Sequence, residues 1–261
     1  MPGTPKIRFA ALALAAMMLG GCDLAISDVL TALPITAEPV GVTPVPPTTA
    51  ANGTPGALPD MPVKPTPQQI TFEGCPPEGD GGDPILNRLK NRVDEGEYVP
   101  VDFESILELT WPTTIERRDR KNWPEAETAE VARYEGIPVS VEGYLYNTRS
   151  QGPESPNCHG ADAVHSDWHV WMIHNLGEDR TVSIVVETTP RVRALHPGWT
   201  VQKMNEAEND ELPVRISGWL MLDPEHPDQL GKTRGTIWEI HPVMKIEFFD
   251  GGQWVLLDDM P

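Results

Sequence analysis

The sequence has few basic residues and no apolar run of the roughly 20 residues that a membrane-spanning helix needs. Its 261 residues include 20 Lys and Arg against 39 Asp and Glu, for a formal net charge of -19. A surface this acidic repels phosphate backbones and anionic headgroups, so the charge argues against nucleic acid as a partner. The chain also lacks a Gly-x-Ser-x-Gly motif, a Gly-rich phosphate-binding loop and a Ser-x-x-Lys motif. No specific enzyme signature is therefore present.

The N-terminal residues have the pattern of an export signal. Lys6 and Arg8 precede a short Ala/Leu/Met-rich run over 9–19, and small residues lead to Cys22. The sequence Leu-Gly-Gly-Cys resembles the lipobox of bacterial lipoproteins, in which the Cys is acylated, as with palmitate, and the signal is cleaved just before it. The resemblance implies a signal peptide over 1–21 and a lipid anchor at Cys22. It implies a location in the bacterial cell envelope, outside the cytoplasm, on either the inner or the outer membrane. A plain secretory signal with an incidental Cys is the alternative.

The chain has only three cysteines, and their number is compatible with a disulfide formed in an oxidising compartment. If Cys22 is acylated, Cys75 and Cys158 remain as one pair. An even remainder in an exported chain predicts a disulfide between them. Metal ligation by Cys158 with His159 is the alternative use.

The composition divides the chain into a spacer and one folded domain. Pro, Thr, Ala and Gly dominate from about 30 to 69, without apolar periodicity. We therefore expect the lipidated N-terminus and a disordered linker over 22–71. Order is expected to begin near Phe72, and 72–261 suffices for a single domain.

The first part of that domain predicts short helices. Asp83 before Pro84 is typical of a helix start, and the apolar spacing that follows predicts a helix to Arg92. A second helical turn or two is expected over 103–109. The charged stretch over 112–126 predicts a surface loop.

The rest of the domain predicts β-structure, with Gly143 and Gly218 placed where strands bend. A less regular stretch over 193–209 leaves room for a helix after the third strand. The predicted strands are 137–145, 167–174, 181–188, 214–221, 235–240, 243–249 and 254–257. Strands bent at Gly, with a helical insert after the third, predict a small Greek-key barrel of the OB type. An open β-sandwich is the alternative.

Three pieces of this region resemble a family of uncharacterised bacterial exported proteins with OB-like domains. They are Val-Glu-Gly-Tyr-Leu, Val-Arg-Ile-Ser-Gly-Trp-Leu and Thr-Ile-Trp-Glu-Ile-His-Pro-Val. The resemblance covers about 75–246. It implies the OB-like fold and no particular activity.

All seven histidines lie within 159–241. His165, Asp167 and His169 alternate, so in a strand they share one face. Two imidazoles beside a carboxylate predict a candidate site for a divalent metal such as Zn²⁺. A polar outer face with partly exposed histidines is the alternative.

A second candidate site follows Arg234. Glu239 and His241 share one face of a predicted strand. A carboxylate beside an imidazole predicts a catalytic base with its orienting partner, and Arg234 is placed to bind an anionic group. The alternative is a structural pair, with Arg234 in a salt bridge to Glu239 or Asp223.

A third polar group ends the predicted strand 181–188. Glu187, Thr189 and Arg191 share one face if that strand continues. Sites are often assembled at a barrel rim. An ordinary solvated rim has the same pattern.

Two functions follow from these features. The first is a membrane-anchored binding or interaction module that recognises a protein or a small molecule outside the cytoplasm. The second is a metal-dependent hydrolase, of the phosphoesterase type, that uses a His/Asp/Glu cluster on the barrel. The sequence does not decide whether the protein is an enzyme.

Overall fold

The computed structural model describes residues 57–59, 64–115 and 119–261. The predicted signal peptide, Cys22 and most of the predicted linker lie outside the described residues. Contacts with the domain begin before Phe72, because the Lys64 ammonium donates to the carbonyls of Ala132 and Glu135.

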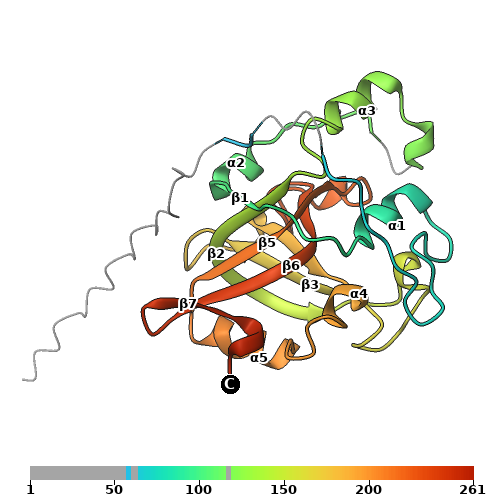
Figure 1. Cartoon of the computed structure of the whole chain (residues 1–261). Coiled ribbons are helices and arrows are strands. Elements are labelled where there is room, and N and C mark those ends of the chain that lie inside the picture. Colours follow the sequence, from blue (N-terminus) through green and yellow to red (C-terminus); the bar gives the residue numbers. More distant parts are fainter. Residues whose placement is uncertain (1–56, 60–63, 116–118) are drawn as a thin grey trace, which may run out of the picture. The chain divides into compact units, whose positions relative to one another are not determined.

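Five strands close into a barrel (Figure 1). They are β2 (Pro138–Ser150), β3 (Trp168–Ile173), β4 (Ile184–Thr188), β5 (Val214–Leu222) and β6 (Trp238–Asp250). Their order is β2-β3-β4-β6-β5, and β5 pairs with β2 to complete the circle. Only the β4–β6 pairing within this circle of described strands is parallel. The closed order confirms the predicted OB-like barrel over the open sandwich.

Two short strands extend the sheet outside the barrel. The strand β1 (Val99–Pro100) pairs with β2, and β7 (Gln253–Leu256) pairs with β6. The strand β7 agrees with the predicted final strand.

Short helices surround the barrel. They are α1 (Pro84–Lys90), α2 (Phe103–Leu107), α3 (Glu125–Val131), α4 (Pro190–Arg193) and α5 (Val201–Asn209), with 3-10 turns η1 (Arg120–Asn122), η2 (Ser155–Asn157), η3 (Arg180–Val182), η4 (Pro227–Gln229) and η5 (Leu257–Asp259). The helix α1 begins as predicted, since the Asp83 side chain accepts from the backbone N–H of Ile85. It packs against β6 on the outside of the barrel (Figure 1). The helix α5 lies in the predicted insert, whereas α4 begins directly after β4, so Arg191 lies in a helix rather than on a continued strand.

Two elements differ from the prediction. The helix α3 begins inside the stretch expected to be a loop. Its exposed acidic residues led to the loop prediction, but the helix buries Val131 at its end. The two strands predicted around Pro242 form one continuous strand, β6. The register with β5 shifts beside Gly218, where a Cβ would lie 2.4 Å from the Pro242 carbonyl oxygen. An irregular register of this kind lets a strand pass through a proline.

The barrel core consists of apolar side chains from alternate strand positions. It includes Val170, Val186, Ile216, Trp238 and Ile240, each at most 1% exposed. The alternate positions point to the opposite face of the strands. That face is where charged residues of β3, β4 and β6 lie.

The predicted disulfide between Cys75 and Cys158 is present. It joins the start of the described domain to the loop between β2 and β3. Cys158 follows η2 directly, so the bond fixes this turn against the segment at Cys75.

Candidate functional site

Charged side chains gather on the face of β3, β4 and β6 that points away from the barrel core. They are His169 in β3, Glu187 in β4, and Glu239 and His241 in β6. His169 and Glu187 are cross-strand partners, and the parallel register of β4 and β6 leads to Glu187 beside His241. Asp167 directly precedes β3. The helix α1 and the loops before β3 and β6 cover this face, so the whole group is buried.

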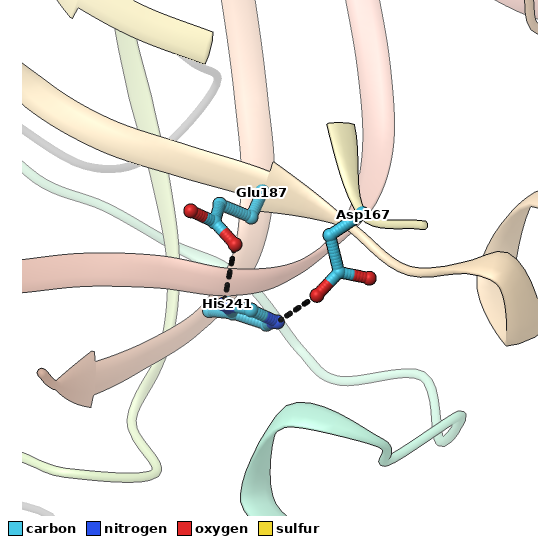
Figure 2. Close-up of side chains that lie close together, drawn as sticks. All are labelled: Asp167, Glu187 and His241. Atoms are coloured by element: carbon cyan, nitrogen blue, oxygen red, sulfur yellow. Dashed lines mark ion pairs between the residues drawn. The ribbon is translucent and has the colours of Figure 1, made fainter. Parts of the chain in front are cut away.

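The centre of the site is the His241 cluster, which consists of Asp167, Glu187 and His241 (Figure 2). The imidazole lies between the two carboxylates. Its Nδ1 is 3.4 Å from Oε2 of Glu187, and its Nε2 is 3.7 Å from Oδ2 of Asp167. The three residues are 0% to 5% exposed.

The facing atoms of the His241 cluster have no hydrogen-bond partner among the described residues. These atoms are Oδ2 of Asp167, Oε2 of Glu187 and both ring nitrogens of His241. Buried polar atoms are paired in the great majority of cases, and leaving one unpaired costs about 1–3 kcal/mol. Buried polar atoms without a partner are typical of a binding or catalytic site.

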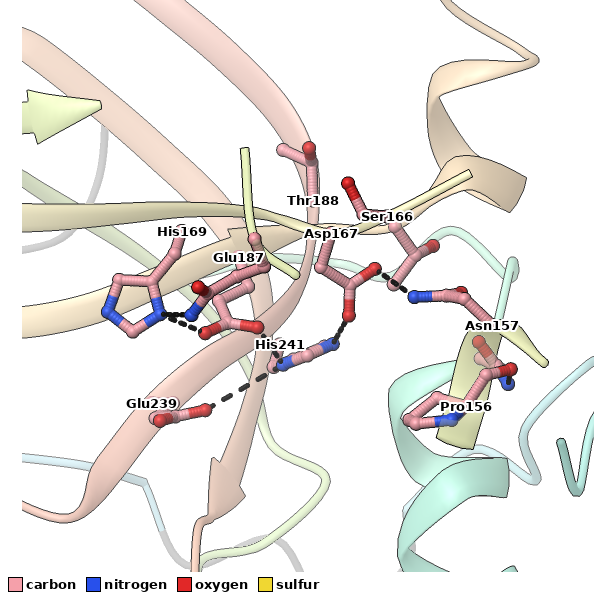
Figure 3. Close-up of polar contacts among 12 residues, drawn as sticks. Pro156, Asn157, Ser166, Asp167, His169, Glu187, Thr188, Glu239 and His241 are labelled. Carbon is pink, nitrogen blue, oxygen red and sulfur yellow. Dashed lines mark hydrogen bonds and ion pairs between the residues drawn. The ribbon is translucent and has the colours of Figure 1, made fainter. Parts of the chain in front are cut away.

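The other carboxylate oxygens are held in place (Figure 3). Asn157 donates from Nδ2 to Oδ1 of Asp167 at 2.9 Å. His169 Nδ1 lies 2.5 Å from Oε1 of Glu187, and 2.7 Å from Nε2 of Gln151. Each carboxylate thus has one oxygen fixed by a neighbour and one oxygen directed at His241.

Burial sets the protonation of the His241 cluster. It raises the pKa of Asp167 above its ordinary value, and it lowers the pKa of His241, which favours the neutral imidazole. Burial also opposes ionisation of Glu187, but the adjacent His169 outweighs burial and holds the pKa of Glu187 well below its usual range. A neutral imidazole between carboxylates offers a free lone pair to a ligand.

A second ionic group lies next to the cluster and is held by short ion pairs. Arg234 Nη1 is 2.9 Å from Oδ2 of Asp223 and 2.6 Å from Oε1 of Glu239. His226 Nδ1 also lies 2.6 Å from Asp223. Burial and the nearby Asp223 charge raise the pKa of Glu239 to about 8. One guanidinium is therefore shared by two carboxyl groups. His226 and Arg234 lower the pKa of Asp223 although burial opposes this.

A polar cavity of about 100 Å³ lies beside the cluster and is lined by Glu187 and by the ionic group of Arg234. Lys90, at the end of α1, is 6% exposed and lines the cavity with Glu154, His169 and Glu239. Burial lowers the pKa of Lys90, but the surrounding carboxylates, Glu154 first among them, raise it above its ordinary value overall. The cavity has room for an ion or a few water molecules rather than a large ligand.

The structure brings together most of the residues that the sequence singled out. Glu239, His241 and Arg234 lie within one group, and the predicted salt bridges of Arg234 are both present. Asp167 and His169 lie on opposite sides of Glu187 and His241 (Figure 3). His165 lies elsewhere: its ring nitrogens contact Glu73 at 2.8 Å and Asp162 at 2.7 Å, and its side chain is 36% exposed.

Four residues of the site were not assigned to it from the sequence. Glu187 was expected at a barrel rim. A charged residue within a strand of buried β-branched residues could have indicated a buried polar site. Asn157 adjoins the disulfide Cys158, which hinted at a fixed loop. Lys90 and Gln151 had no local signal, because only the packing of α1 and of the loop after β2 brings them here.

Neither a protein-family model nor a curated protein matches the sequence. The chemistry of the site therefore rests on its own geometry. Three buried residues offer two carboxylate oxygens and an imidazole nitrogen within one small volume. Such a group can bind a cation, or exchange a proton with a ligand in the cavity.

Proposed function

We propose that this protein is a membrane-anchored binding module of the bacterial cell envelope, and that it holds a small ligand at the His241 cluster. The anchor is the acylated Cys22 that the lipobox resemblance implies. The head is the OB-like barrel. No described helix is long and apolar enough to cross a bilayer.

The position of the cluster within the fold supports a binding role. OB folds bind their ligands on the face of the second and third barrel strands and with the loops after the first and fourth strands. Here these elements are β3, β4, the loop over 151–167 and the loop over 223–237. The His241 cluster and its cavity draw residues from all four.

The observation that carries the proposal is the set of buried, unpaired atoms in the His241 cluster. A cluster kept for stability would have its atoms paired. We therefore expect Asp167→Asn to stabilise the metal-free protein by about 1 kcal/mol, because it removes a buried charge. The amide oxygen still accepts the hydrogen bond from Asn157. The measurement is the thermal midpoint of the full-length protein in detergent with EDTA. A lower midpoint for Asp167→Asn would show that the cluster is structural.

The anchor has its own test. Full-length protein, produced in a bacterium that processes lipoproteins, is expected to incorporate radioactive palmitate and to sediment with membranes. Cys22→Ser is expected to abolish the label, whereas Cys75→Ser with Cys158→Ser keeps it. Equal labelling of the Cys22→Ser protein would disprove the anchor without touching the proposed site.

A metal-dependent hydrolase is the second candidate, favoured by the cavity beside the cluster. Glu239 and Arg234 line this cavity, so a substrate atom inside it would contact an acid–base group and a cation. The probe is methyl phosphate with Mn²⁺ or Zn²⁺, read out by the release of inorganic phosphate. Turnover that Glu239→Gln abolishes would establish the enzyme, and no turnover would leave the binding module.

A further inference from the structure

We propose that the small ligand is a divalent transition-metal ion, Zn²⁺ in first place, bound by Asp167, Glu187 and His241. This inference rests on the proposed function and names the ligand of the same site. The set differs from the predicted one, since Glu187 and His241 take the places of His165 and His169.

The donor atoms are close enough for one ion. One ligand atom from each residue lies within 4.8 Å of the other two. Zinc binds nitrogen and oxygen ligands at about 2.0–2.2 Å, which places two ligand atoms about 3–4 Å apart. Nε2 of His241 lies 3.7 Å from Oδ2 of Asp167, whereas Nδ1 lies 3.4 Å from Oε2 of Glu187. An ion bound by Nε2 and Asp167 therefore requires the Glu187 side chain to rotate from Nδ1 toward the ion.

The neighbours of the donors are arranged as in metal sites. Carboxylates that bind a metal are usually held by a hydrogen bond to the other oxygen. Asn157 does this for Asp167, and His169 does it for Glu187. The ring nitrogen of His241 that does not bind the ion also has an acceptor nearby. Glu239 lies 3.7 Å from Nδ1, so it can accept that N–H when Nε2 is the ligand.

The charge of the cluster fits a dication. With both carboxylates ionised on metal binding, the three donors supply two negative charges in a buried space, which match a dication. Arg234 does not neutralise them, because it forms ion pairs with Asp223 and Glu239. An anion at the same place would face Asp167 and Glu187 directly.

The donor types select the metal. One imidazole with two carboxylates suits Zn²⁺ or Mn²⁺, whereas Ca²⁺ and Mg²⁺ prefer all-oxygen sites. Thiolate-bound metals have no ligand among the described cysteines, because Cys75 and Cys158 are bonded to each other. Zn²⁺ stands ahead of Mn²⁺ because three protein ligands in a small closed space favour four-coordination.

The experiment uses full-length protein in detergent, stripped with EDTA and then dialysed. Elemental analysis after addition of Zn²⁺ is expected to give one ion per chain. The thermal midpoint is expected to rise by about 5 °C or more at 100-fold excess over the dissociation constant. Co²⁺, used as a spectroscopic substitute, is expected to give visible absorption typical of four-coordinate nitrogen and oxygen ligands.

Matched variants locate the ion. Asp167→Asn and Glu187→Gln keep the shape of each side chain and are expected to weaken Zn²⁺ binding at least tenfold. His165→Ala is the control, because His165 contacts Glu73 and Asp162 rather than the cluster. It is expected to bind Zn²⁺ as the wild type does. Circular dichroism confirms that each variant is folded.

Three outcomes would overturn the inference. They are no bound Zn²⁺, Mn²⁺ or Co²⁺ in the wild type, full binding by both cluster variants, and loss of binding in His165→Ala. If no ion binds while Asp167→Asn still stabilises the metal-free protein, the metal is wrong and the binding module stands. If Asp167→Asn destabilises the metal-free protein, the proposed function itself fails.

Discussion

Two buried polar regions meet at Asn157, and they differ in how their atoms are paired. Arg191 is 0% exposed, and all three of its guanidinium nitrogens donate. Its acceptors include the carbonyls of Cys75 and Pro76 and the side chain of Asn91. The His241 cluster is equally buried, yet its facing atoms are unpaired.

The difference separates scaffold from site. Arg191 ties the segment at Cys75, the helix α1 and the turn η2 together through acceptors that are all neutral. Every bond it makes exists in the ligand-free protein. The His241 cluster has four facing atoms without a hydrogen-bond partner among the described residues. Asn157 lies between the two, since its Oδ1 accepts from Arg191 and its Nδ2 donates to Asp167.

The largest effect is expected on the scaffold side. Arg191→Met removes the shared donor and with it the hydrogen bonds from a charged group to Asn91, Cys75 and Pro76. We expect a loss of about 4 kcal/mol in the free energy of unfolding, measured by urea denaturation with EDTA. Arg149→Met is the control. Arg149 is exposed and lies over Trp171, so about 1 kcal/mol or less should be lost there. If both variants lose a similar free energy of unfolding, the buried hydrogen bonds of Arg191 contribute no more to stability than an ordinary surface contact.

The disulfide connects the scaffold to the site and gives the second prediction. It closes a loop with a sequence separation of 83, so replacing both Cys75 and Cys158 by Ser is expected to cost about 3 kcal/mol of stability. Because Asn157 precedes Cys158, the same change should loosen the residue that orients Asp167. Zn²⁺ affinity is expected to fall about tenfold, measured by titration calorimetry. Unchanged affinity would mean that Arg191 alone fixes Asn157.

The sequence predicted local features of the fold better than it predicted the site. Alternation identified the strands, and Asp83 with Pro84 identified the start of α1. The closed barrel followed from the number of strands and the position of the helical insert. The continuous β6 did not follow, because a proline is expected to interrupt a strand unless the register shifts beside it, as it does at Gly218.

The site depends on contacts between residues far apart in the chain. Alternation placed Asp167 with His169, and Glu239 with His241, on shared faces. It could not reveal that β4 and β6 are parallel neighbours, which is what joins Glu187 to His241. Side chains alternate between faces only within a strand. Because β3 begins at Trp168, His165 lies in a turn before the strand and contacts Asp162 instead of the cluster.

The smallest expected effect concerns the pH dependence of the cavity. Burial raises the pKa of Glu154 from 4.5 to about 8, and Lys90 only partly opposes this. The raised pKa means that the neutral carboxyl is favoured in the folded state. Its contribution to stability is complete below about pH 4.5 and is lost as the pH rises through 8. We expect the free energy of unfolding to fall by about 1 kcal/mol between pH 6 and pH 8, a modest loss because the side chain is partly exposed.

Glu154→Gln removes this loss, so the stability of the variant should fall less steeply with pH than that of the wild type. Glu206→Gln, on the exposed side of α5, is the control and should follow the wild type. The measurement is urea denaturation with EDTA at both pH values. If the free energy of unfolding of Glu154→Gln and of the wild type falls equally between the two pH values, the Glu154 carboxylate is in contact with solvent. The unfavourable burial of polar groups in this region would then be confined to the His241 cluster.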